Sequence, residues 1–462
     1  MKTCSTAAGA VLLLCGAAFA QELQPRLGEP LRGLGPNQLQ RFHQGRVVFN
    51  TPIEAADGLG PAFNDRSCGG CHSGPAVGGA SDRTVTRFGR AAGGGRPFDP
   101  LAHLGGSLLQ EQAISVDCEE HVPPQADVIA GRLTPTTMGG GLLETIEDAD
   151  ILFLADNQPP GLNGFAHMVP LLEDPNAPLR PARFGWKGVI ATVKSFSIDA
   201  SLGEMGLTTV FLPNETAPNG DQDQLALCDA VADPEDVPDA QGFTKVDRFT
   251  DFQRFLAAPA QTPRSGMAGE TLFDGIGCGG CHYTPGFVTG TAPEAALSGV
   301  PIKPYSDFLL HDMGSLGDGI VQGLATETIM QTRALWGLRF RERLLHDGRA
   351  TGGFFEDDVV AAIAEHAGEG QAASDAFFAL GQGERDLVVA FLGSLGRIEL
   401  DFEIDNDLDE FDWFFIEPFL TGPGAGTIGP DDPGAICDVD QDGDFDLIEF
   451  GLLQRGWTGN LP

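Results

Sequence analysis

Positive charge is scarce in this chain of 462 residues. Only 28 residues are Lys or Arg, against 65 Asp or Glu, and the formal net charge is −37. Such a chain repels the phosphates of nucleic acid, so nucleic acid is excluded as a partner. The charge is equally consistent with recognition of a basic protein and with plain solubility. Part of it has a local origin, because Arg455 is the only basic residue after position 398.

Long apolar runs are also rare. The apolar run at the N-terminus, residues 7–19, follows Lys2 and ends at the small-residue pattern Ala-Phe-Ala of residues 18–20. This pattern is typical of a secretory signal peptide, and the run is too short to span a bilayer. We therefore expect residues 1–20 to be removed. The mature chain is expected in the periplasm, or elsewhere outside the cytoplasm or at the cell surface, with no transmembrane segment.

Cysteine is sparse, and most of the nine cysteines fall into recognisable groups. Cys4 and Cys15 lie in the signal peptide, and four others form two short motifs described below. Cys118, Cys228 and Cys437 remain, which allows one internal disulfide and leaves one thiol over. We expect Cys118 to pair with Cys228.

The sequence Cys-Gly-Gly-Cys-His occurs twice, at 68–72 and at 278–282. In such a motif the two thiols add to the vinyl groups of haem, and the histidine binds the iron. A thioredoxin-like redox pair or half a zinc site needs neither the adjacent histidine nor a second copy. The motifs therefore predict two covalently bound haem c groups. Their attachment residues are Cys68, Cys71, Cys278 and Cys281, and their proximal iron ligands are His72 and His282.

Similar segments precede the two motifs. Gly-Arg-Val-Val-Phe (45–49) precedes the first and Gly-Glu-Thr-Leu-Phe (269–273) the second, each typical of the last turn of an amphipathic helix. Elsewhere Gly and Pro are frequent and long periodic stretches are few. We predict a mainly α protein with two c-type cytochrome domains and long loops. The expected units are a first domain at 36–215, a linker at 216–247, a second domain at 248–398 that begins with a short helix at 249–256, and a small helical module at 399–462.

The C-terminal region contains an EF-hand-like loop at 438–449. Acidic residues occupy its first, third, fifth, ninth and twelfth positions, and Gly443 occupies the sixth, where a sharp turn is needed. A weaker copy lies 37 residues earlier, at 401–412, and apolar residues after both loops predict two helices that pack together. We expect calcium in both loops. The expected ligands are Asp438, Asp440, Asp442, Asp444 and Glu449, and in the weaker loop Asp401, Glu403, Asp405, Asp407 and Asp412.

The C-terminal repeats resemble dockerin-type calcium-binding repeats, which implies a module with a docking partner. Residues 36–398 resemble the bacterial di-haem oxidoreductase family, labelled thiol oxidoreductases, which is related to di-haem cytochrome c peroxidases. No residue here points to a thiol substrate. The stretches that carry this resemblance are 58–64, 139–144, 183–187, 204–208, 304–307, 310–314 and 345–349.

The peroxidase relatives imply roles for two residues. Trp186 falls where they place a tryptophan between the haems, so it would carry electrons between them. Glu204 falls where they place a carboxylate over an open haem iron, so it would act as the acid/base. A core tryptophan and a surface glutamate are the structural alternatives. The relatives' glutamine position holds Phe196, which puts efficient peroxide chemistry in doubt.

The resemblance also bears on the distal iron ligands. Relatives take the distal ligand of the second haem from a helix that here covers 359–366, so His366 is the expected sixth ligand. The second choice is His311 or Met313. Alternatively, His366 only stabilises the C-terminus of the helix. His346 is expected near a haem edge. Where peroxidase relatives have the distal histidine of the first haem, this chain has Phe88, so that haem is expected to be open. Other ligands left open for it are Met138, His43, His103 and His121.

Two main functions follow. The first is an enzyme of cytochrome c peroxidase type, in which the second haem passes electrons through Trp186 to an open first haem. The second is an electron-transfer cytochrome with both irons six-coordinate. In either case the expected partner is a redox protein, and the net charge of −37 favours a basic one. A calcium-dependent scaffold with structural haems is a third, weaker alternative.

Overall fold

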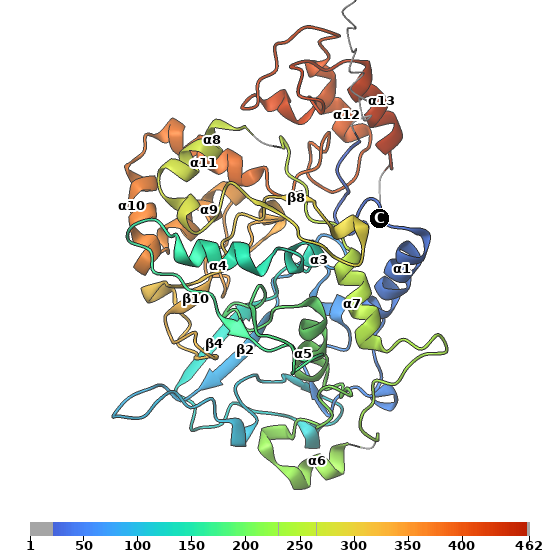
Figure 1. The fold of residues 1–462 in the computed structure, drawn as a ribbon, viewed down its shortest axis with the longest axis vertical. Helices are drawn as coiled ribbons and strands as arrows, with labels where there is room; N and C mark the ends of the chain where they lie inside the picture. Colours follow the sequence, from blue (N-terminus) through green and yellow to red (C-terminus); the bar gives the residue numbers. More distant parts are fainter. Residues whose placement is uncertain (1–21, 230, 265, 460–462) are drawn as a thin grey trace, which may run out of the picture.

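Helices and irregular loops build most of this protein (Figure 1). The computed structural model describes residues 22–229, 231–264 and 266–459, so the expected signal peptide lies outside the described residues. No helix within these ranges is long and apolar enough to cross a membrane. The helices are α1 (Pro36–Asn50), α2 (Cys68–Cys71), α3 (Gly140–Glu144), α4 (Asp148–Asp156), α5 (Val193–Met205), α6 (Gln222–Cys228), α7 (Lys245–Phe255), α8 (Ala268–Gly275), α9 (Phe355–Ala364), α10 (Gln371–Ala379), α11 (Gln382–Gly393), α12 (Glu410–Ile416) and α13 (Leu447–Gly456).

The sheets of the described chain are all two-stranded and antiparallel. The longest pairs β2 with β4, where Thr84 lies opposite Leu133 and Gly89 opposite Val128. The other pairs are β1 with β3, β5 with β6, β7 with β8, and β9 with β10. The strands are β1 (Ala62–Phe63), β2 (Thr84–Gly89), β3 (Gln112–Ala113), β4 (Val128–Leu133), β5 (Met168–Val169), β6 (Arg180–Pro181), β7 (Phe287–Val288), β8 (Pro301–Ile302), β9 (Leu310–Asp312) and β10 (Ile329–Gln331).

Helix α1 packs closely against α7 to form the first core. The close approach requires Gly45, because a Cβ at this position would lie 2.4 Å from the carbonyl oxygen of Arg248. Phe49 and Phe252 are buried in the contact, with ring centroids 4.8 Å apart. The expected short helix at 249–256 is thus longer, Lys245–Phe255, and it packs on α1 and α5 although it overlaps the predicted second domain.

Helix α8 packs against α11 in the same way to form the second core. A Cβ on Gly269 would lie only 1.9 Å from the carbonyl oxygen of Leu387, so this position also requires glycine. Phe273, four residues later, contacts Phe391 at a centroid distance of 5.4 Å. The repeated Gly-x-x-x-Phe sequence therefore encodes one packing arrangement used twice.

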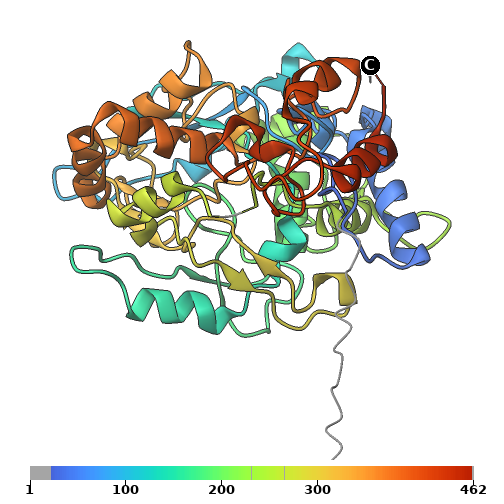
Figure 2. The same ribbon diagram turned by 90° about the horizontal axis from the view of Figure 1, so that it is seen from above.

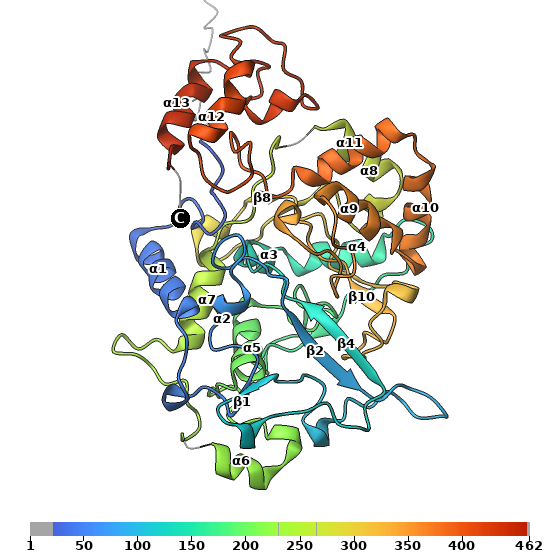
Figure 3. The same ribbon diagram turned by 180° about the vertical axis from the view of Figure 1, so that it is seen from behind.

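The C-terminal residues 400–459 form a module with its own apolar core, which includes Leu408, Ile416, Phe445 and Leu452. The module lies at one end of the long axis, next to the N-terminal segment (Figures 1 and 3). Viewed from above, the helices that follow the second motif and helix α1 lie on opposite sides of the molecule (Figure 2).

One disulfide joins two loops of the first half, Cys118 to Cys228, as expected from the sequence. It ties the 3₁₀ turn Val116–Cys118 to α6, within the region expected to be a linker. Cys437 is buried in the C-terminal module and carries a free thiol.

Candidate haem-binding sites

The first motif folds as the short helix α2 with its histidine just beyond. Ser67 caps this helix, and its Oγ accepts a hydrogen bond from the N–H of Gly70 at 3.0 Å. The backbone N–H of His72 donates to the carbonyl of Cys68 at 2.9 Å. The Nδ1–H of His72 donates to the carbonyl of Gly79 at 3.2 Å. Because Nδ1 is engaged, Nε2 is the nitrogen left to bind iron.

The second motif has the same arrangement in a 3₁₀ turn, Cys278–Gly280. The backbone N–H of His282 donates to the carbonyl of Cys278 at 2.9 Å. Its Nδ1–H donates to the carbonyl of Tyr305, also at 2.9 Å. Burial lowers the pKa of His282 to about 4 and also lowers the pKa of His72, so both imidazoles are neutral, as iron ligands must be.

The helix before each motif places a phenylalanine against the motif histidine. The ring centroids of Phe49 and His72 are 6.1 Å apart with an interplanar angle of 51°. Those of Phe273 and His282 are 6.0 Å apart, again at 51°. The two sites therefore share one local architecture, set by the repeated sequence before each motif.

The four motif cysteines are free thiols, and none is joined to another. Burial raises the pKa of Cys71 to about 11 and that of Cys278 to about 12, and it also raises the pKa of Cys68 and Cys281. Each pair lies in the wall of a cavity together with its motif histidine. Two thiols and one imidazole with a free Nε2 form the donor set of a covalently attached haem, so the residues at both sites fit this cofactor.

The first cavity has a volume of about 670 Å³. Among the described residues that line it, His72 is the only histidine. Phe88 is buried in β2 and does not line the cavity, and neither do Met138, His43, His103 and His121. Phe196 does line it, and so does Met205, which is packed in the first core.

Two carboxyl groups from α5 face the first cavity, Glu204 and Asp199. The Nδ2 amide of Asn64 donates to Glu204 Oε2 at 2.8 Å and fixes this carboxyl. Burial raises the pKa of both carboxyls, and the positive charge of Arg87 opposes the shift. Arg87 also lines the cavity, and its buried Nε has no hydrogen-bond partner. The cavity wall therefore includes two acids that favour their protonated forms, Glu204 and Asp199, together with the guanidinium of Arg87.

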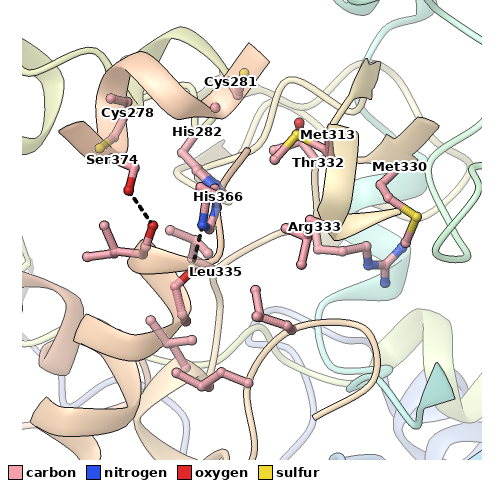
Figure 4. Close-up of a pocket in the computed structure, with 18 of the residues that line it drawn as sticks. Cys278, Cys281, His282, Met313, Met330, Thr332, Arg333, Leu335, His366 and Ser374 are labelled. Carbon is pink, nitrogen blue, oxygen red and sulfur yellow. Dashed lines mark hydrogen bonds between the residues drawn. The ribbon is translucent and has the colours of Figure 1, made fainter. Parts of the chain in front are cut away.

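The second cavity, of about 220 Å³, is lined by three histidines, and two of them, His282 and His366, project into the same space (Figure 4). His366 follows α9, which ends at Ala364 and not at position 366 as expected. Its Nδ1–H donates to the carbonyl of Ala362 at 2.8 Å, so its Nε2 is available, as in His282. Burial lowers the pKa of His366 and keeps its ring neutral.

His311 is not available as an iron ligand, because both of its ring nitrogens are engaged. Nδ1 lies 2.9 Å from Glu369 Oε2, and Nε2 lies 2.9 Å from Asp307 Oδ2. Burial lowers the pKa of His311, but hydrogen bonding to Asp307 and Cys281 outweighs it and raises the pKa to about 11. The second-choice ligand Met313 lines the second cavity.

Trp186 lines both cavities. Its indole N–H donates to the carbonyl of Leu133 at 2.9 Å, which fixes the ring. On the side of the second cavity, His346 contacts this ring edge-on at a centroid distance of 6.2 Å. The guanidinium carbon of Arg333 lies 5.7 Å from the ring centroid. One aromatic side chain is therefore in contact with the two sites.

The two acidic loops of the C-terminal module have similar backbones. Ile404 and Gln441, at their fourth positions, have φ values of 63° and 61°. Asn406 and Gly443, at their sixth positions, have φ values of 72° and 91°, in a region that suits these two residue types. Each loop leads into a helix, α12 or α13, through an aspartate N-cap.

Only some of the expected calcium ligands converge. Oxygens of Asp438, Asp440 and Glu449 lie within 4.8 Å of one another, and those of Asp444, Asp446 and Glu449 form a second such group. In the first loop the converging residues are Glu403, Asp409 and Asp412. Asp401, Asp405, Asp407 and Asp442 lie outside these groups, and the carboxylates of Asp401 and Asp405 accept backbone N–H groups within the loop.

Burial raises the pKa of several of these carboxyls. The values reach about 7 for Glu449 and Asp401 and about 6 for Asp412. Glu449 is 1% exposed, and its Oε1 has no hydrogen-bond partner. An orphaned buried carboxylate oxygen beside other carboxylates fits a hard cation.

Several residues of these sites were not among the ligands or catalytic groups expected from the sequence. Asp199 and Arg87 have no motif, and only the fold brings them to the first cavity. Asp409 and Asp446 occupy the ninth loop position, where the EF-hand pattern provides a signal. Another missed group is Glu215, Asp233 and Glu235, whose carboxylate oxygens lie within 4.8 Å of one another. Burial raises the pKa of Glu215 to about 8.

Comparison with known proteins gives one informative match. Residues 115–395 match the family model described as "Di-haem oxidoreductase, putative peroxidase". No curated protein matches. Among solved structures, hydrazine synthase of Kuenenia stuttgartiensis pressurised with xenon is 13% identical, with a TM-score of 0.32, over 86% of this chain and 98% of that chain. A MauG-like protein associated with microbial copper homeostasis is 13% identical, with a TM-score of 0.33, over 81% of this chain and 93% of that chain. Because the family model spans more than half of the sequence, this chain belongs to the di-haem oxidoreductase family.

Proposed function

We propose that this di-haem oxidoreductase is a peroxidase-type enzyme that works outside the cytoplasm, with Trp186 carrying electrons from the His282 site to the His72 site. The observation that carries the proposal is the position of Trp186, whose side chain lines both cavities. A single aromatic ring in contact with both sites shortens the path between them. The expected secretory signal and the haem motifs together support the location.

The two sites would have different tasks. His366 and His282 project into one cavity, so both would hold one iron there, and a six-coordinate iron mainly transfers electrons. His72 has no second histidine opposite it among the described residues of its cavity. Its iron would keep a position open for peroxide. When bound, haem supplies one-electron redox chemistry and, at an open iron position, a place for peroxide.

Reduction of peroxide to two waters consumes two electrons and two protons, so the first cavity must hold protons. Glu204 is suited to this task, because Asn64 fixes Oε2 while Oε1 can carry a proton toward the substrate. The raised pKa of Glu204 keeps the carboxyl protonated to a higher pH than in water. Asp199, on the same helix, would hold the second proton, and Arg87 would orient substrate oxygens from β2.

The holoprotein tests the unequal sites by spectroscopy. The proposal expects one high-spin haem in the resting or half-reduced protein, binding of cyanide, and peroxide-dependent oxidation of an electron donor. Two low-spin haems in every redox state, without cyanide or peroxide binding, would instead establish an electron-transfer cytochrome. Phe196 in the cavity wall and a Met205 thioether bound to iron would be consistent with that outcome.

Two substitutions test the assigned roles. Glu204→Gln is expected to slow the reaction with peroxide by roughly 10²–10⁴-fold while leaving both haem spectra unchanged. Glu111→Gln, an exposed carboxyl near Asn64, is the matched control and should retain the full rate. Trp186→Phe is expected to slow electron transfer between the haems in a rapid-mixing experiment. Unchanged rates in both variants would refute the roles of Glu204 and Trp186.

The C-terminal loops support a second part of the proposal, calcium binding. The orphaned Oε1 of the buried Glu449 and the converging Asp438 and Asp440 favour a cation in the second loop. Glu403, Asp409 and Asp412 favour one in the first. The acidic surface would also suit a basic redox partner, and the dockerin-like repeats a docking partner.

Calorimetry of the full chain tests the calcium sites. Two binding events are expected in the wild type, and Glu449→Gln should remove one of them. Glu417→Gln, an exposed glutamate of the module outside both loops, should bind calcium as the wild type does. Absence of any heat on adding calcium to the wild type would refute calcium binding.

A further inference from the structure

The N-terminal arm, residues 22–31, runs along the C-terminal module and is bonded to it. Leu23 packs against the apolar core of the module. The backbone N–H of Gln24 donates to Glu399 Oε2 at 2.8 Å, and its side-chain amide donates to Glu399 Oε1 at 2.9 Å. Glu399 also pairs with Arg264 at 3.0 Å. Segments almost 400 positions apart in the sequence therefore meet at the end of the molecule (Figure 1).

The closest link is made by a residue of the first acidic loop itself. Asn406 exchanges two hydrogen bonds with the backbone of Leu27. The N–H of Leu27 donates to Asn406 Oδ1 at 2.9 Å, and Asn406 Nδ2 donates to the carbonyl of Leu27 at 3.2 Å. The backbone N–H of Asn406 donates to Asp401 Oδ2 at 3.0 Å, so the same residue belongs to the folded loop.

The corresponding position of the second loop is Gly443, which has no side chain for such a bond. EF-hand loops need a left-handed residue here, and glycine meets this need at the lowest steric cost. Asparagine tolerates this left-handed conformation, and its side-chain amide can also form hydrogen bonds with groups outside the loop. The difference between the two loops thus coincides with the contact to the arm.

The arm continues from this contact to the first haem site. Leu27 is 5% exposed and lies in the same apolar cluster as Phe49, whose ring contacts His72. Beyond it, the N–H of Ala257 donates to the carbonyl of Glu29 at 3.0 Å, and the N–H of Leu31 donates to the carbonyl of Phe255 at 2.8 Å. A continuous set of packed and hydrogen-bonded groups therefore joins the first acidic loop to the first haem core.

We propose that the first acidic loop, when it holds calcium, clamps the N-terminal arm through Asn406 and so stabilises the first haem core. The partner of this loop is then a segment of the same chain. The inference rests on the calcium binding proposed above. A ligand that binds only the folded loop stabilises whatever is coupled to that loop. Without the cation, the carboxylates of Glu403, Asp409 and Asp412 repel one another and loosen it.

The test uses the full holoprotein and the variant Asn406→Gly, which copies the residue of the second loop. Thermal unfolding is followed at the Soret band, which reports on the haem cores, with calcium and with a chelator. The calcium ion of the first loop, at about 100 times its dissociation constant, should raise the wild-type midpoint by roughly 3 °C. In Asn406→Gly we expect two calcium ions to bind by calorimetry, as in the wild type, but at least half of that rise to be lost.

Each result has a separate meaning. An equal rise in the wild type and in Asn406→Gly overturns the clamp and leaves calcium binding intact. A wild type that binds calcium with no shift of the Soret midpoint also overturns the clamp alone. A wild type that binds no calcium overturns the calcium sites and the clamp together. If Asn406→Gly does not fold, Asn406→Asp, which tolerates the same φ but lacks the Nδ2 donor, gives the same comparison.

Discussion

A buried charge cluster next to Trp186 gives a sharp test of how the two haem sites are held together. The side chain of Asp318 is fully buried between Lys187 and Arg132, at 2.9 Å and 2.6 Å. Lys187 directly follows Trp186, and its ammonium also donates to the carbonyls of Thr326 and Ile329 at 2.9 Å and 2.7 Å. Asp318→Asn leaves two buried cations without a counter-charge.

Removing one partner of a buried ion pair costs about 3–5 kcal/mol. With an unfolding entropy of about 2.1 cal/mol/K per residue, a chain of this length loses roughly 1 °C of Tm per kcal/mol. We therefore expect Asp318→Asn to lower Tm by about 3–5 °C in scanning calorimetry. Adding Lys187→Met should recover part of this loss, because one stranded cation is removed with it.

Two comparisons make this prediction refutable. The pair between Asp347 and Arg349 is partly exposed, at 2.7 Å, so Asp347→Asn should cost at most about 1 kcal/mol. Burial raises the pKa of Asp318, but Arg132 and Lys187 outweigh it and hold the pKa below its usual range. The contribution of Asp318 to the free energy of unfolding is thus present above its pKa in the unfolded chain, about 4. It is lost as the pH falls through the lower pKa of Asp318 in the folded protein. An Asp318→Asn effect equal to that of Asp347→Asn, or one that does not shrink as the pH is lowered below 4, would refute the reasoning.

Three further predictions concern other parts of the molecule. His366→Ala should convert one low-spin haem to high spin, and an unchanged absorption or electron paramagnetic resonance spectrum would rule out this ligand. Replacing both Cys118 and Cys228 by Ser removes a crosslink between residues 110 positions apart. The free energy of unfolding in denaturant titrations should then fall by about 4 kcal/mol, because the disulfide restricts the unfolded chain. A loss under 1 kcal/mol would refute this entropic effect of the disulfide. Burial raises the pKa of Glu215 to about 8, so its stabilising contribution is lost as the pH rises through this value. Glu215→Gln should therefore raise Tm at pH 9 relative to the wild type and have little effect on Tm at pH 5. Equal changes of Tm at the two pH values would contradict the raised pKa of Glu215.

The sequence could predict the parts of the sites that are set by neighbouring residues. The two thiols and the histidine of each motif are adjacent, so their geometry follows from a single turn. The Gly-x-x-x-Phe segments are also local, since one helical turn brings Gly45 and Phe49 to the same face. The spacing of acidic residues at 401–412 and 438–449 gives the similar loop backbones for the same reason.

The environment of each site depends on contacts between distant segments. Asp199 and Arg87 come from α5 and β2 and meet only across the first cavity. His311 belongs to a short turn that resembles the family pattern, but Glu369 and Asp307 engage both of its ring nitrogens. No periodic pattern in the sequence predicts such contacts between side chains, because they depend on how loops of irregular backbone pack together.

The sequence by itself predicted two haem-binding motifs, each with a histidine after its second cysteine, and two acidic loops near the end of the chain. Those features depend on residues a few positions apart, whose relative placement is limited by backbone geometry. Only the tertiary structure decided that Trp186 lines both cavities and that Asn406 is bonded to Leu27. It also decided that His366 faces His282, while among the described residues no second histidine lines the cavity of His72. These outcomes depend on long-range packing of apolar cores, in which each side chain is placed by neighbours from distant parts of the chain.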